Sequence, residues 1–281
     1  MTRPKGFPKA DPLSLTLRLL VWLAAAVTTL VFIAMVVYVL IKGVPHLTPS
    51  LFSLHYNSEN VSLLPALVNT VGVTALSLLV AVPLGVFSAV YTVEYARRGN
   101  QLVKIVRMTA ETLSGIPSIV YGLFGFLFFV SALGWGYSML AGVFTLAIMI
   151  LPLILRTTEE ALKSVPDAFR EGSFGLGAGR LRTVFKIVLP AAQPGILAGV
   201  ILGVGRIVGE TAALIYTAGT VAKIPGSLLE SGRTLSVHMY ALASEGLYID
   251  QTYATAVVLL VIVAGINALS STLARRLTRE R

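Results

Sequence analysis

Long runs of residues without a single charge most limit what this chain can fold into. Residues 19–41 and 251–274 contain no Asp, Glu, Lys or Arg, and residues 112–155 form a third, much longer run. A helix needs about 20 apolar residues to cross the hydrocarbon core of a bilayer, which is about 30 Å thick. Only 12% of the residues are charged and 56% are hydrophobic, whereas about 25% of residues in soluble domains are charged. The runs therefore predict an integral membrane protein.

The remaining apolar segments set the number of spans. Residues 112–155 are too long for one crossing and are expected to form two helices joined by a hairpin at Leu133–Tyr137. Residues 60–93 provide one more span, and residues 187–222 another, interrupted only by Arg206 and Glu210. The sequence thus predicts a single all-α, polytopic transmembrane domain with six helices. The expected spans are 16–41, 66–91, 108–132, 138–157, 191–218 and 251–274, with an inner loop at 158–190.

Six spans place both termini on the same side of the membrane, and the basic residues indicate which side. Of the 22 Lys and Arg residues, 18 lie on the side of the termini, three lie on the other side and Arg206 lies inside a span. Loops on the cytoplasmic side are enriched in basic residues, so both termini are expected in the cytoplasm. The net charge of +9 then follows from topology and indicates no nucleic-acid partner. The inner set is Arg3, Lys5, Lys9, Arg18, Arg97, Arg98, Lys104, Arg107, Arg156, Lys163, Arg170, Arg180, Arg182, Lys186, Arg275, Arg276, Arg279 and Arg281, and the outer set is Lys42, Lys223 and Arg233.

The predicted spans contain no residue pattern typical of a membrane enzyme. The chain has no cysteine, which excludes thiolate nucleophiles and Cys-ligated metal sites. Its histidines, His46, His55 and His238, all fall in the predicted outer loops, and none has a second ligand at metal-binding spacing. The sequence also lacks a phosphate-binding loop of the form G-x-x-x-x-G-K-[ST]. We therefore expect a non-catalytic protein that binds no metal and no cofactor itself.

The inner loop at 158–190 is the longest polar segment and contains a short predicted helix. Pro166 and Asp167 are typical of a helix start, and Gly177–Gly179 would end it. Phe169, Phe174 and Leu176 give this helix an apolar surface between charged flanks. Such a helix could lie on the membrane surface or dock a partner protein.

The same loop carries a spaced motif. Glu171-Gly172-Ser173 is followed after three residues by Gly177 and after nine more by Ile187-Val-Leu-Pro190. This pattern resembles the cytoplasmic signature of ABC-importer permeases, E-A-A, three residues, G, nine residues, I-x-L-P. Gly172 and Ser173 depart from it by replacing two alanines, although they are also small.

The resemblance implies the type I ABC-importer permease fold and a coupling helix that sits in a groove of a cytoplasmic ATPase. It assigns ATPase coupling to residues of the motif and its helix. These are Phe169, Glu171, Gly172, Ser173, Phe174, Gly177, Leu189 and Pro190.

The fifth predicted span contains two charged residues. Arg206 and Glu210 stand four residues apart, so a continuous helix would place them on one face, about 6 Å apart along its axis. Charges inside a bilayer are costly, and these are expected to face the bundle interior or a water-filled path. They could neutralise each other, or Arg206 could bind a passing anion, because guanidinium suits phosphate oxygens. In the same span, Gly199 and Gly203 form a G-x-x-x-G pattern that favours close helix packing.

The segment from Arg206 to Ala212, R-x-x-G-E-T-A, resembles the PstA-type permeases of phosphate importers, as does the stretch Leu235–Glu245. The resemblance implies that Arg206, Glu210 and Thr211 line a phosphate path. It also implies a PstC-like permease as pseudo-symmetric partner and a PstS-like binding protein that delivers phosphate. A PstB-like ATPase dimer would bind ATP and magnesium. The expected location is the cytoplasmic membrane of a bacterium or archaeon.

Two alternatives remain open at this point. The same architecture could import another oxyanion, such as molybdate or sulfate. An autonomous channel or ion-coupled carrier could instead use Glu210 or Glu111 as a proton or cation site, but it would not need a spaced docking loop.

Overall fold

The computed structural model describes residues 12–97 and 99–279 of the chain. Every regular element in these residues is a helix, which confirms the all-α prediction. Five residues that contribute to the predicted charge asymmetry lie outside the described residues, namely Arg3, Lys5, Lys9, Arg98 and Arg281.

The long helices make up most of the described structure. They are α1 (Pro12–Gly43), α2 (Leu64–Val90), α5 (Met139–Lys163), α8 (Leu189–Val208) and α11 (Ile249–Arg279). Shorter helices connect them, namely α3 (Gln101–Ser114), α4 (Ser118–Gly125), α6 (Asp167–Gly175), α7 (Arg180–Thr183), α9 (Ala212–Ile215) and α10 (Leu235–Glu245). Two 3-10 turns follow α1, η1 (Val44–His46) and η2 (Pro49–Phe52), and π-helical turns occur at η3 (Tyr91–Tyr95), η4 (Phe126–Ala132) and η5 (Val184–Val188).

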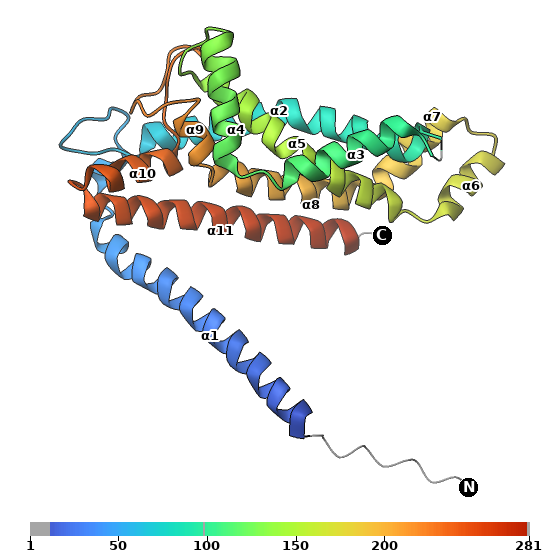
Figure 1. Cartoon of the computed structure of the whole chain (residues 1–281), viewed down its shortest axis with the longest axis horizontal. Coiled ribbons are helices and arrows are strands. Elements are labelled where there is room, and N and C mark those ends of the chain that lie inside the picture. Colours follow the sequence, from blue (N-terminus) through green and yellow to red (C-terminus); the bar gives the residue numbers. More distant parts are fainter. Residues whose placement is uncertain (1–11, 98, 280–281) are drawn as a thin grey trace.

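Helix α5 lies at the centre of the molecule. It packs between α2 and α8, and α11 runs along α8, whereas α1 extends away from this body (Figure 1). Leu146 and Ile150 of α5 are completely buried in the largest apolar cluster. The apolar side chains of α1 are exposed along its length, as expected for a helix whose surroundings are lipid.

A row of glycines lets α8 approach α5 closely. A Cβ atom added to Gly199 would lie 2.7 Å from Cβ of Thr157, and one added to Gly195 would lie 2.7 Å from Cβ of Ala161. Gly203 continues the row toward Ile154. The predicted role of the G-x-x-x-G pattern in helix packing is confirmed.

The third predicted span differs from a straight helix. α3 and the segment Ser118–Ala132 meet at an angle of 105°. The break falls at Gly115–Pro117, because Pro117 lacks an amide hydrogen and disfavours helical backbone in the residue before it. The described residues thus contain five helices long and apolar enough to span a membrane, or six if this bent pair counts as one.

The fifth predicted span is also shorter than expected. The sequence predicts a helix over 191–218, but α8 ends at Val208 with Gly209 as its C-cap residue. The chain then forms the single turn α9 and leaves the helical direction. The apolar composition of this segment conceals the break, because glycine is common inside membrane helices as well as at their ends.

Candidate functional site

The first candidate site is the exposed helix α6 of the inner loop. Asp167 is its first residue after Pro166, as the sequence predicts. At the other end, the amide of Gly177 donates to the Phe174 carbonyl (2.9 Å) and the amide of Ala178 donates to the Ser173 carbonyl (3.1 Å). These two bonds form a Schellman motif, which needs left-handed backbone at Gly177, where φ is +81°. The motif glycine therefore ends the helix and turns the chain back toward α7.

The outer surface of α6 is apolar and open. Phe169 is 52% exposed, Phe174 is 47% exposed and Leu176 is 91% exposed. Phe169 and Leu176 line a shallow groove of about 470 Å³. Exposed aromatic residues grouped on one short helix are typical of a protein contact. The other residues that line the groove are Ala168, Gly172, Ser173, Gly177, Ala178, Arg182 and Ile187.

The other motif residues take part in packing within the chain. The Ser173 hydroxyl lies 2.8 Å from the Thr183 hydroxyl, which ties α6 to α7. Leu189 begins α8 and packs, partly buried, against an apolar cluster that includes Leu162 and Val188. Pro190 follows the π-helical turn η5, within a helical stretch that runs without interruption from Arg180 to Val208. The motif therefore combines an exposed part on α6 with a part that packs in the helical segment leading into α8.

Arg170 attaches α6 to the bundle, a role that the sequence does not predict. Its Nη2 atom lies 2.7 Å from Oε1 of Glu94. The guanidinium also donates to the carbonyl of Leu162 (2.9 Å) at the end of α5 and to that of Val165 (2.8 Å) in the turn that follows. The hydrogen bond to Glu94 raises the pKa of Arg170. Nothing in the sequence signals this pairing, because Glu94 precedes Arg170 by 76 residues.

The second candidate site surrounds Arg206 and Glu210. The prediction that the two share one helical face is wrong, because α8 ends between them. Oε1 of Glu210 instead accepts a hydrogen bond from the Ala213 amide (3.1 Å), and its carbonyl accepts one from the Ser236 hydroxyl (2.6 Å). Glu210 is only 9% exposed. Its carboxylate therefore caps the turn α9, and none of the ion pairs within the described residues joins it to Arg206.

Thr211 sits beside this cap. Its hydroxyl donates to the Gly209 carbonyl at 3.4 Å, and its side chain is half-buried. The structure places Thr211 at the turn between α8 and α9, next to Glu210.

Arg206 lies in the last turn of α8 and is half-buried. The next residue, Ile207, is buried in the same apolar cluster as Tyr121 of α4, and Leu113 and Ile116 at the α3–α4 break pack against that cluster. The Tyr121 hydroxyl donates to the Leu113 carbonyl (2.7 Å) at the end of α3. In the part of the chain that the structure describes, the guanidinium makes no ion pair. An unpaired cation in a membrane helix must face water or another protein. The site is thus an arginine in the last turn of α8, next to a residue that packs in the same cluster as the break between α3 and α4.

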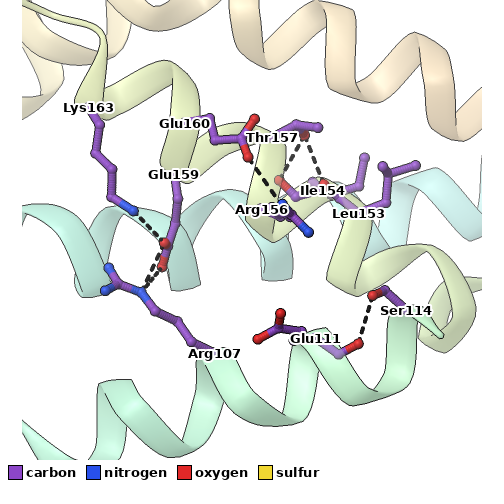
Figure 2. Close-up of polar contacts among 10 residues, drawn as sticks. All are labelled: Arg107, Glu111, Ser114, Leu153, Ile154, Arg156, Thr157, Glu159, Glu160 and Lys163. Atoms are coloured by element: carbon purple, nitrogen blue, oxygen red, sulfur yellow. Dashed lines mark hydrogen bonds and ion pairs between the residues drawn. The ribbon is translucent and has the colours of Figure 1, made fainter.

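Further charges lie between α3 and α5. Figure 2 shows Glu111 pointing from α3 toward α5, on the side where Arg156 and Glu160 form a pair at 3.2 Å. Glu111 belongs to the last turn of α3, and its carbonyl accepts a hydrogen bond from the Ser114 hydroxyl (2.7 Å). The residue pattern predicts no role for Arg156 and leaves that of Glu111 open.

The histidines stay apart from these charges. The His46 Nε2 atom lies 3.5 Å from a carboxylate oxygen of Asp250, whereas His238 is completely buried in α10. Among the described residues no three His, Cys, Asp or Glu side chains are grouped to hold a metal ion.

Comparison with known proteins gives consistent results. Residues 81–281 match the protein family described as "Binding-protein-dependent transport system inner membrane component". The "Probable ABC transporter permease protein YqgI" of Bacillus subtilis is 34% identical over 248 residues, which cover 81% of this chain and 82% of YqgI. The "Phosphate transport system permease protein PstA" of Pasteurella multocida is 39% identical over 179 residues, 63% of each chain.

A solved structure supports the fold. A chain of the bacterial alginate ABC transporter, crystallised with an alginate-bound periplasmic protein, superposes with a TM-score of 0.63. The match covers 92% of this chain and 95% of that chain at 19% sequence identity. The predicted ABC-importer permease fold is therefore confirmed.

Proposed function

The chain belongs to the family of binding-protein-dependent transport system inner membrane components, and we propose that it is the permease through which an ATP-driven importer moves inorganic phosphate into the cytoplasm. The family makes it a multi-pass, non-catalytic permease subunit of an ABC importer in the inner membrane. The proposal concerns the cargo, the partners and the residues that serve them.

The observation that carries the phosphate assignment is the guanidinium of Arg206, which has no ion-pair partner among the described residues. Its neighbour Ile207 packs in the same apolar cluster as the residues at the break between α3 and α4. Guanidinium is permanently charged and offers a planar fork of donors that matches phosphate oxygens. The identity of 39% to a PstA permease supports the same cargo. In this proposal Arg206 contacts the anion as it passes. Glu210 and Thr211 hold the turn after α8 and so keep Arg206 at the path.

The exposed face of α6 supports a partner that supplies the energy. We assign Phe169, Glu171, Gly172, Phe174 and Gly177 to docking on a PstB-like ATPase dimer. ATP and magnesium would be bound by that dimer, because this chain carries no nucleotide-binding loop. Ser173 ties the docking helix to Thr183 of α7. Leu189 packs the helical segment that follows against the bundle, and Pro190 stands beside it.

The remaining partners and the orientation complete the proposal. A PstC-like permease would cover the face of this chain that bears Arg206, and a PstS-like protein would deliver phosphate from outside. Both termini are placed in the cytoplasm, because that orientation puts most basic residues inside. The spans would switch between inward-open and outward-open states as the ATPase dimer closes and opens.

Competition between oxyanions tests the cargo. The four components are reconstituted in proteoliposomes, and uptake of radiolabelled phosphate is measured while unlabelled phosphate, sulfate or molybdate is added outside. With the unlabelled anion in about tenfold excess over the labelled phosphate, the assay detects a difference of about 1.4 kcal/mol in binding free energy between two oxyanions. We expect only phosphate to compete. If sulfate or molybdate suppresses uptake as strongly as unlabelled phosphate does, the result would favour that oxyanion as the cargo.

A further inference from the structure

Two buried carboxylates lie at the inner ends of the helices, next to the π-helical turn η3. Glu94 is 7% exposed and Glu159 is 5% exposed. Buried carboxylates are costly unless they are paired and hydrogen-bonded. The partners of each come from different helices, so the two carboxylates join segments that are distant in the sequence.

The first carboxylate connects the docking helix to α2. Glu94 belongs to η3, which continues α2. Its Oε1 atom accepts a hydrogen bond from Nη2 of Arg170 in α6 at 2.7 Å. The Arg170 side chain is only 16% exposed. Its further bonds to the Leu162 and Val165 carbonyls join the end of α5 to the same contact. Arg170 therefore links α6 both to η3 and to the end of the α5 segment.

The second carboxylate connects the same turn to α3. The Thr92 hydroxyl, also in η3, donates to Oε1 of Glu159 in α5 at 2.5 Å. Arg107 of α3 donates from Nε to both oxygens of Glu159, at 3.1 and 3.0 Å, and Lys163 binds the second oxygen at 3.0 Å. Figure 2 shows Arg107 and Lys163 reaching Glu159 from α3 and α5. Thr92 and Glu94 both belong to η3, so the contacts of the two carboxylates meet on this one π-helical turn.

Helix α3 depends on this contact because it has little buried apolar surface. Val103 is the one buried residue among its 14 residues. Its last residues lead into the break before α4, where Leu113 packs against the apolar cluster that contains Tyr121 and Ile207, the residue after Arg206. A shift of α3 would therefore move the break that borders the proposed anion path.

We propose that Arg170, Glu94, Thr92, Glu159 and Arg107 form a polar relay that makes α3 follow the docking helix α6. The inference rests on the proposed docking of an ATPase on α6. The five side chains are positioning residues, because they act on the path through the position of α3. Closure of the ATPase dimer shifts α6, and the relay transfers that shift to the break between α3 and α4.

A single reporter cysteine tests the relay in the assembled complex. The chain has no native cysteine, and Ser114 is exposed at the end of α3. In the Ser114→Cys complex, the rate of thiol labelling is measured in two states, once with the ATPase free of nucleotide and once with ATP and vanadate bound to it. We expect the two labelling rates to differ about tenfold, which corresponds to about 1.4 kcal/mol in the free energy of exposing the thiol. Adding Arg107→Gln should reduce this ratio to less than about twofold.

Lys104→Gln is the matched control. Lys104 is an exposed cation one turn before Arg107 on the same helix, and it is absent from the ion pairs of the described residues. The control should keep the full labelling ratio. ATP hydrolysis should continue in Arg107→Gln while phosphate uptake falls, so the ATP consumed per phosphate should rise about tenfold.

The outcomes separate the relay from the proposed function. Equal labelling ratios in Arg107→Gln and Lys104→Gln would overturn the relay alone. If Arg107→Gln does not assemble, Thr92→Val replaces it, because that change removes one hydrogen bond to Glu159 and keeps every charge. A Thr92→Val complex with the wild-type labelling ratio would also overturn the relay. Failure of the ATPase to co-purify with the unmodified permease would overturn the docking proposal itself.

Discussion

The Nη2 atom of Arg170 lies 2.7 Å from Oε1 of Glu94, and this contact fixes the exposed helix α6 to the end of the α2 segment. The pair is mostly shielded from solvent, and Arg170 also donates to the Leu162 carbonyl of α5, to the Val165 carbonyl just after α5 and to Asp167. A helix held in this way moves with the bundle. The apolar residues on its outer side are exposed, so Arg170 helps to join the proposed docking surface to the membrane helices.

The left-handed backbone at Gly177 provides the first prediction. A side chain there would be strained, at a cost of about 1–2 kcal/mol, and β-branched residues tolerate this conformation least. Gly177→Val should distort the end of α6 and weaken docking. A loss of about 1.4 kcal/mol in docking free energy would reduce phosphate uptake about tenfold, so we expect a reduction of this size or more. Uptake per assembled complex is the measurement.

Gly175→Val is the control for that prediction. Both glycines have open space around an added Cβ atom, but Gly175 is helical and Gly177 has φ of +81°. Equal uptake by the two variants would show that the backbone conformation at Gly177 is unimportant for coupling.

Membrane orientation is predicted by the distribution of basic residues. Glu171 and Ser244 are both exposed in the described structure. In the cysteine-free background, Glu171→Cys should react with an impermeant thiol reagent only from the cytoplasmic side, and less when the ATPase is bound. Ser244→Cys should react only from outside. The reverse pattern would contradict the assigned topology.

The buried His238 should make stability depend on pH. Burial, and then the charge of Arg233, lower the pKa of His238 from 6.5 to about 3. As the pH falls below 6.5, His238 therefore takes up a proton in the unfolded chain but stays neutral in the folded chain. The stabilisation is complete above about pH 6.5 and is lost toward pH 3. Between pH 6.5 and pH 5 the loss should be about 1.5 kcal/mol in the free energy of unfolding.

Thermal unfolding of the purified complex at several pH values checks this prediction. His238→Phe keeps an aromatic ring that can meet Tyr56 edge to face, as the imidazole does at a centroid distance of 6.1 Å. The variant should lose most of the pH dependence, whereas His55→Gln, at an exposed position, should keep it. An unchanged pH dependence in His238→Phe would assign the effect to other groups.

Features that depend on local pattern are predictable from the sequence. Apolar runs indicate the long helices, Pro166 and Gly177 indicate the ends of α6, and the spacing of Gly199 and Gly203 indicates close packing. Each of these depends on residues that are near one another in the chain. Local pattern therefore predicts the helix content and the docking loop.

Features that depend on tertiary contacts or on helix ends are not predictable in this way. The same apolar run can form a straight helix or a broken one. It therefore predicts neither the bend at Gly115–Pro117 nor the end of α8 at Val208. The expected shared face of Arg206 and Glu210 holds only for a continuous helix. The contacts of Glu94 and Glu159 join residues tens of positions apart, and no sequence spacing reports them.

In the proposed path, Arg206 serves the passing anion and does not neutralise Glu210. The double variant Arg206→Met, Glu210→Gln removes both charges, and the carboxamide introduced by Glu210→Gln would keep an oxygen for the Ala213 amide. An internal ion pair can often be replaced by uncharged residues with little loss, whereas removing one partner costs about 3–5 kcal/mol. Arg206→Lys keeps the charge but loses the planar fork, so it should transport weakly.

Phosphate uptake by the reconstituted importer, normalised to assembled complex, distinguishes these two roles of Arg206. We expect Glu210→Gln alone to transport, and the double variant to assemble but to transport as poorly as Arg206→Met. Near-normal uptake by the double variant would contradict a role for Arg206 in the phosphate path.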